Sequence, residues 1–181
     1  MSSTTQLPEK LSQVTFGFFD VIELPELGYC GGLLIVSSIG RPLEFHCTAP
    51  VSTNRTQQIM YGQTYLGFLY ADQIGGALID RLKQPPAIMM VQNAELLPIS
   101  EMVDGAVVMF EPRESTKAFD GVGLHHFETE QHRCWIVNHK PEQVDTLTTH
   151  VSSFAEKLPL DEPMERIAQA IEEAHSVLRA A

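Results

Sequence analysis

The stretch that decides the fold of this chain is residues 31–48, which read GGLLIVSSIGRPLEFHCT. Two apolar segments flank a turn marked by Gly40 and Pro42, a pattern that predicts a β-hairpin. The first segment is apolar on both faces, which is typical of a covered central strand. The second segment alternates, so one face carries Leu43, Phe45 and Cys47 and the other carries Glu44, His46 and Thr48.

The same patterns predict further strands and helices along the chain. A helix over 64–83 has an apolar arc that covers more than half of its circumference, so we expect it to be buried. Gly67, Ala71 and Gly75 lie at the centre of this arc and predict close packing of the helix backbone, with a cofactor or dimer contact as the alternative. Strands are expected at 14–24, 87–92, 106–111 and about 132–138, and two C-terminal helices begin near 141 and 161.

The resulting order, β-β-β-α-β-β-β-α-α, predicts an α+β fold. We expect a mainly antiparallel sheet of five to six strands, a long buried helix and two C-terminal helices. In arrangement this order resembles longin, roadblock and profilin-type domains, which surround a five-stranded antiparallel sheet with helices. We expect a flexible N-terminus over residues 1–13 and a single domain over 14–181.

Composition narrows the classes of function and partner. The formal net charge of the 181 residues is −11, which opposes binding to phosphate-rich surfaces, so we predict no nucleic-acid partner. No apolar run reaches the ~20 residues that span a membrane, so we predict no membrane insertion. The start of the chain has no secretory signal, and the three cysteines form no Cys-x-x-Cys pair. These features predict a cytoplasmic protein.

A first group of candidate site residues lies on the predicted hairpin and in the segment after it. On one strand face, Glu44 can raise the pKa of His46 and orient it as a general base, so these two are the candidate catalytic residues. Amides, hydroxyls and guanidinium groups nearby can bind a ligand or a peptide. The ligand-binding candidates are Arg41, Thr48, Asn54, Arg55 and Tyr61.

Two further groups carry metal-binding chemistry. A chain reversal in 125–134 would gather imidazole, carboxylate and thiol groups that zinc accepts, with a solvated polar hairpin as the alternative. The metal candidates are His126, Glu128, His132 and Cys134. A nuclease carboxylate cluster is suggested by Asp20, Glu23 and Glu44, but a suitable lysine is missing and the net charge opposes DNA binding.

Because no catalytic motif occurs, we predict a non-enzymatic protein-interaction, adaptor or regulatory module that binds a protein partner or self-associates, for example as a homodimer. One alternative is a small enzyme or small-molecule-binding protein that uses His46 with Glu44, assisted by Arg41 or Arg55. The other is a metal-binding protein that uses the four ligands named above. We predict no cofactor, with zinc as the alternative.

Overall fold

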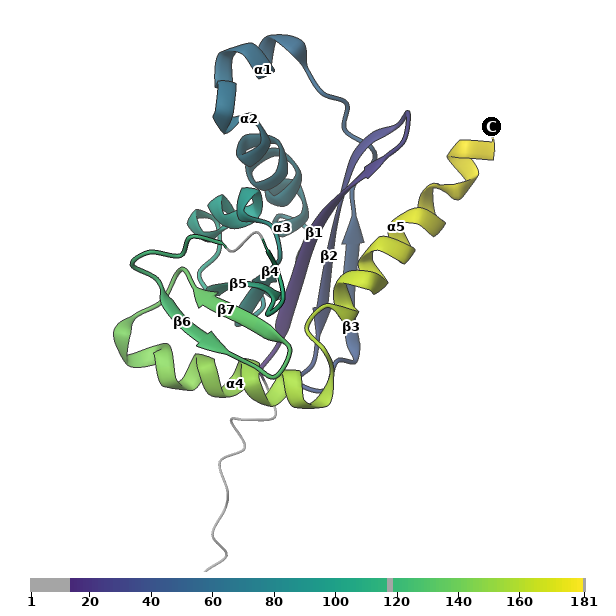
Figure 1. Ribbon diagram of the computed structural model, residues 1–181. Helices are drawn as coiled ribbons and strands as arrows, with labels where there is room; N and C mark the ends of the chain where they lie inside the picture. Colours follow the sequence, from purple (N-terminus) through teal and green to yellow (C-terminus); the bar gives the residue numbers. More distant parts are fainter. Residues whose placement is uncertain (1–13, 117–118, 181) are drawn as a thin grey trace, which may run out of the picture.

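Seven strands form one sheet with helices on both faces (Figure 1). The computed structural model describes residues 14–116 and 119–180, so the predicted flexible segment 1–13 lies outside the described residues. The strands are β1 (Phe16–Leu24), β2 (Gly28–Val36), β3 (Pro42–Cys47), β4 (Ile88–Val91), β5 (Ala106–Pro112), β6 (His125–Glu128) and β7 (His132–Ile136). The helices are α1 (Arg55–Tyr61), η2 (Gly62–Thr64), α2 (Tyr65–Gly67), η3 (Phe68–Gly75), α3 (Gly76–Ile79), η4 (Ala94–Glu101), η5 (Pro141–Gln143), α4 (Val144–Lys157) and α5 (Glu162–Ala180).

The strand order is β3-β2-β1-β4-β5-β7-β6. β1, β2 and β3 form an antiparallel meander, β4 and β5 run parallel to β1, and β7 and β6 are antiparallel again. The predicted mixed fold with a mostly antiparallel sheet is therefore confirmed. The predicted five to six strands and the longin-like arrangement are wrong in detail, because the sheet has seven strands and three central strands are parallel. The parallel pairing arises because the chain crosses from β3 to β4 through the helices α1 to α3.

The predicted hairpin forms as β2, a turn and β3. Gly40 has a φ of +77°, a left-handed conformation that glycine adopts without a steric penalty. Its N–H donates to the carbonyl of Ser37 at 2.9 Å and closes the turn. The register pairs Leu33 with His46 and Leu34 with Phe45, so the alternation predicted for the second strand holds.

The sheet separates two apolar layers. On one face, strand residues such as Phe18 and Met90 pack against α4 and α5. On the other face, residues such as Phe19 and Met89 pack against the helices between β3 and β4 and against η4. Gly75 supports the predicted close packing of the long helix, because a Cβ atom built on it would lie 3.1 Å from Cζ of Phe19.

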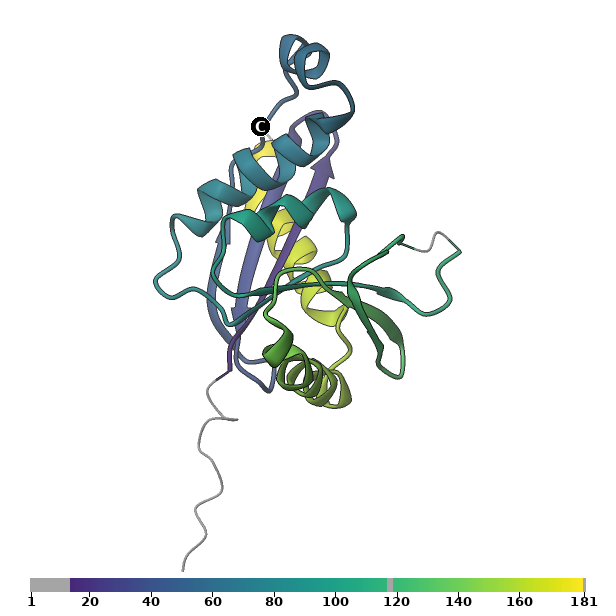
Figure 2. The same cartoon turned by 90° about the vertical axis from the view of Figure 1, so that its left-hand side faces the viewer.

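The helical region between β3 and β4 is irregular where one helix was predicted over 64–83. Its central segment, η3, has π-helical hydrogen bonding, which often occurs at functional sites. α1 contains no buried residue and projects beyond the end of the sheet (Figures 1 and 2). Within the described residues, none of the helices combines the length and apolar character needed to cross a bilayer.

Candidate functional site

The predicted catalytic pair lies on the edge strand β3. Oε1 of Glu44 lies 2.6 Å from Nε2 of His46, as the strand spacing predicts. The same carboxylate accepts the backbone N–H of Lys83 at 3.0 Å. The hydrogen bond from His46, followed by that from Lys83, lowers the pKa of Glu44. The pair thus holds the chain after α3 against the sheet, and neither residue lines the cavities described below.

The predicted ligand-binding residues do not converge. The hydroxyl of Thr48 accepts the N–H of Gly31 at 3.0 Å, which is a structural role within the hairpin. Asn54 caps α1 by accepting the N–H of Gln57 at 3.0 Å. Arg41 and Arg55 are both exposed, one at the hairpin turn and the other at the start of α1.

The four predicted metal ligands are split between the two faces of the β6–β7 hairpin. The register pairs His126 with Trp135, whereas Cys134 faces the apolar layer under α4. The remaining two ligands follow the same alternation, so Glu128 shares a face with His126 and His132 shares one with Cys134. Within the residues that the structure describes, no group of three or more His, Cys, Asp or Glu side chains is placed to hold a metal ion.

His132 is the member of this set with the most specific surroundings. It is 2 % exposed, lies 3.6 Å from Oδ1 of Asp161, and lines two neighbouring cavities of about 310 and 520 Å³. Burial lowers the pKa of His132, and the nearby Asp161 carboxylate only partly opposes this effect. The imidazole is therefore neutral at pH 7. It packs edge-on against the ring of Phe110, with the two ring centroids 5.4 Å apart.

The carboxyl ends of the parallel strands β1 and β4 meet at one edge of the sheet. In open sheets, ligands bind at such an edge where the chain connections diverge to opposite sides, as they do here between β1 and β4. The parallel pairing of β1 with β4 ends with Phe18 opposite Met90, and Asp20 lies two residues beyond this last pair, toward the edge. Nothing in the sequence indicates that β4 is the neighbour of β1.

Asp20 is a half-buried carboxylate in the central strand. Burial raises the pKa of Asp20 to about 6, and the N–H of Val21, which Oδ1 accepts at 2.9 Å, opposes this shift. Among the described residues no cation pairs with Asp20. Perturbed carboxylates of this kind gather at functional sites. The available signal in the sequence was an acidic residue in the middle of an apolar strand.

The predicted carboxylate cluster is split by the alternation of β1 and by distance across the sheet. Asp20 shares a face with Phe18, whereas Glu23 lies on the opposite face of the same strand. Glu44 is on the face of Glu23, but it lies two strands away and is occupied by His46. The three carboxylates therefore do not form one site.

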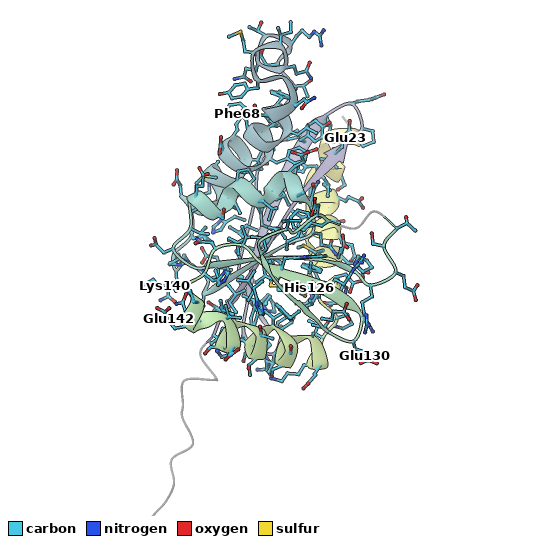
Figure 3. All side chains as sticks on the ribbon, turned by 60° about the vertical axis from the view of Figure 1, so that its left-hand side comes forward. Glu23, Phe68, His126, Glu130, Lys140 and Glu142 are labelled. Carbon is cyan, nitrogen blue, oxygen red and sulfur yellow. The ribbon has the colours of Figure 1, made fainter. Side chains whose placement is uncertain are left out.

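A second feature is an aromatic surface at the end of the molecule that carries α1. The rings of Tyr61 and Phe68 stack at 4.2 Å with an interplanar angle of 15°. Tyr61 is 41 % exposed, and the pair lines a cavity of about 360 Å³. The cavity is also lined by Gln63, Thr64, Gly67, Asp72, Glu95 and Pro98. Figure 3 shows Phe68 and Glu23 toward this end, far from His126 on the β6–β7 hairpin.

Next to this cavity, Tyr70 and Tyr29 place their rings 5.5 Å apart. Burial, followed by the proximity of Tyr29 and Glu23, raises the pKa of Tyr70 to about 12, so its hydroxyl remains a hydrogen-bond donor at neutral pH. The arrangement offers stacking faces, hydroxyls and carboxylates from η3, β2 and η4. Of these residues, Tyr61 is one of the ligand-binding candidates named from the sequence, whereas Phe68 and Tyr70 fall in the helix predicted over 64–83.

No protein-family model matches the sequence, and no curated protein matches it either. Solved structures do match. The catalytic domain of human Endonuclease V is 10 % identical, with a TM-score of 0.60 over 91 % of this chain and 85 % of that chain. Endonuclease V of Ciona intestinalis, in complex with a 23mer DNA containing an inosine followed by a ribo-adenosine, is 12 % identical, with a TM-score of 0.56 over 96 % of this chain and 91 % of that chain.

These matches correct several predictions. The prediction of an interaction, adaptor or regulatory module is wrong. The order of elements on which that prediction was based is found in the fold of a nuclease. The exclusion of nucleic acid is also wrong, since it rested on net charge and a protein of this fold is solved with DNA. The alternatives built on His46 and on the four metal ligands are not supported, because the first pair has a structural role and the second group is divided. The chain has the fold of Endonuclease V.

Proposed function

We propose that this protein binds single-stranded nucleic acid, with an unpaired base stacking on Tyr61 and Phe68. The observation that carries the proposal is the fold, which covers nearly the whole chain and which the Ciona intestinalis protein uses in a complex with DNA. The exposed aromatic stack beside a cavity supports the same proposal from this chain's own residues.

The chemistry of the cavity suits a nucleobase. Aromatic side chains bind unpaired bases by stacking, which contributes about 1–3 kcal/mol per base and tolerates any sequence. Gln63, Asp72 and Glu95 offer amide and carboxylate groups that can bond the polar edge of a base. A volume of about 360 Å³ is in the range of ligand sites in proteins. Paired bases hide their faces, so we expect a preference for single strands.

The proposal is tested by fluorescence anisotropy with labelled single-stranded and double-stranded oligonucleotides of DNA and RNA. Tyr61→Ala should weaken single-strand binding by about 5- to 150-fold, which corresponds to the loss of one stacking partner. Tyr61→Phe should retain binding, because the ring is preserved. Since α1 buries no residue, both variants should fold as the wild type does.

A matched control is Leu43→Ala. Leu43 is also exposed but lies on β3, so its truncation should leave binding unchanged. The proposal fails if the wild type binds none of the oligonucleotides, or if Tyr61→Ala and Leu43→Ala bind as tightly as the wild type.

A further inference from the structure

We infer that the cavity beside Tyr61 and Phe68 selects guanine among the unpaired bases, with the carboxylate of Glu95 accepting two hydrogen bonds from the edge of that base. The inference rests on the proposed function and adds the identity of the base that binds. Its basis is the set of polar groups that line the cavity, at the end of the molecule where Figure 3 labels Phe68.

Glu95 brings a hydrogen-bond acceptor to the helical segment that carries the aromatic stack. It lies half-buried in the first turn of η4, and a Cβ atom built on Gly67 would lie 3.9 Å from its Oε2. Because Gly67 has no side chain, the carboxylate can approach the helix this closely. Gly67 directly precedes Phe68, so the carboxylate lies beside the backbone position next to one of the two stacked rings.

The carboxylates that line the cavity are not engaged with other protein groups. Among the described residues, neither Glu95 nor Asp72 uses its carboxylate in a hydrogen bond or an ion pair. Asn93 accepts the backbone N–H of Glu95 at 2.9 Å, which fixes the start of η4 without using the carboxylate. The lining residues include no Lys, Arg or His. A ligand that fits this cavity therefore combines a flat face for stacking with hydrogen-bond donors at its edge.

Guanine is the base whose edge matches a carboxylate. Its N1–H and N2–H donors lie side by side, so the two oxygens of one carboxylate can accept both, as in a bidentate arginine pair. Adenine and cytosine place a ring-nitrogen lone pair beside their amino donor, and a carboxylate oxygen repels that lone pair. Thymine and uracil have one N–H between two carbonyls, and hypoxanthine keeps N1–H but has no amino group. The amide of Gln63, which also lines the cavity, can donate to O6 of guanine.

The test uses single strands that carry one base flanked by abasic sugar residues, so that only this base can enter the cavity. The base is guanine, hypoxanthine, adenine, cytosine or thymine, and affinity is measured by fluorescence anisotropy. The guanine strand should bind about 5- to 150-fold more tightly than the adenine, cytosine and thymine strands, as a bidentate contact provides. It should bind about tenfold more tightly than the hypoxanthine strand, which lacks one of the two charge-assisted hydrogen bonds.

Two matched variants identify the group that reads the base. Glu95→Gln should abolish the preference for guanine over hypoxanthine, because the amide oxygen accepts only one of the two hydrogen bonds. Glu101→Gln removes the same charge from the other end of η4, does not line the cavity and should keep the preference. Since both variants change the net charge equally, the ratio of the two affinities is compared. Tyr61→Ala should weaken binding of every strand alike, because stacking does not depend on the edge of the base.

Each outcome separates the inference from the proposed function. A guanine preference that disappears in Glu95→Gln and remains in Glu101→Gln supports the inference. The inference is overturned, and the proposed function still stands, if the hypoxanthine strand binds as tightly as the guanine strand, if the preference survives Glu95→Gln, or if both variants lose it. If neither these strands nor ordinary single strands bind, the proposed function fails and the inference falls with it.

Discussion

Asp20 lies across the β1–β2 ladder from Gly32, whose missing side chain lets α5 approach the sheet next to the carboxylate. A Cβ atom on Gly32 would collide with Ile167 of α5. The close approach of this helix removes water from Asp20 and accounts for its raised pKa. The glycine pair at residues 31 and 32 thus shapes both the packing and the electrostatics of the central strand.

The first prediction concerns the pH dependence of stability. Burial raises the pKa of Asp20 to about 6 in the folded protein, from 3.8 for an unperturbed aspartate. A raised pKa favours the protonated folded state, so the contribution of Asp20 to stability is fully present below pH ~4 and is lost as the pH rises through ~6. Compared with Asp20→Asn, the wild type should lose up to about 3 kcal/mol of unfolding free energy between pH 4 and pH 8.

Urea unfolding of both proteins at several pH values checks this prediction. The histidines with lowered pKa values, His132 and His150, titrate in both proteins and cancel in the difference. A difference between wild type and Asp20→Asn that stays constant from pH 4 to pH 8 would contradict the prediction.

The second prediction concerns close packing at Gly31. A Cβ atom there would overlap Cγ2 of Ile74 and lie 3.0 Å from Cδ1 of Leu78. Gly31→Ala should therefore destabilise the protein by about 1–3 kcal/mol, as overpacked cores do. The matched control is Gly76→Ala in α3, where the nearest atom is Sδ of Met102 at 3.8 Å and helix propensity favours alanine. Chemical denaturation showing equal stabilities for the two variants would argue against this packing.

The third prediction concerns the buried ion pair between β5 and β7. Glu111 is 6 % exposed, and its Oε1 lies 2.7 Å from the guanidinium of Arg133. Its other oxygen accepts the N–H of Phe119 at 3.1 Å, which ties the backbone at Phe119 to β5. Arg133→Met should cost about 3–5 kcal/mol, because it leaves a buried charge without a partner.

Adding Glu111→Gln to Arg133→Met should recover part of this loss, since the neutral amide still accepts the N–H of Phe119 and no charge remains buried. Thermal unfolding of the two variants provides the comparison. If the double variant is less stable than Arg133→Met alone, the ion pair is not the source of the loss.

The fourth prediction concerns salt. Arg113, Arg133 and Arg166, three of the twelve Lys and Arg residues, are held by carboxylates, and the net charge of −11 opposes contacts with phosphates. Each phosphate contact on a single strand contributes about −0.7 to the slope of log K against log salt concentration. We expect a total slope shallower than about −2, measured by anisotropy between 50 and 300 mM salt. A much steeper slope would mean that phosphate contacts, and not base stacking, dominate binding.

Local sequence patterns predicted local structure well. Alternation placed Glu44 and His46 on one face of β3, and their 2.6 Å contact follows from that spacing. The hairpin turn at Gly40 and the two C-terminal helices were also predicted. β6 was not among the predicted strands and was expected only as part of a polar hairpin in 125–134, because its residues, His125–Glu128, are polar and mostly exposed and show no apolar alternation.

The sequence by itself determined the strands, the hairpin and which residues share a face, because side-chain alternation in a strand is a local property. Only the tertiary structure decided which strands are neighbours, since pairing is set by packing between residues far apart in the chain. That pairing sets β4 beside β1, whereas alternation along β1 itself puts Asp20 and Glu23 on opposite faces. The stacking of Tyr61 on Phe68 depends on the irregular helical path from α1 to η3. The candidate site therefore depends on contacts that no local pattern contains.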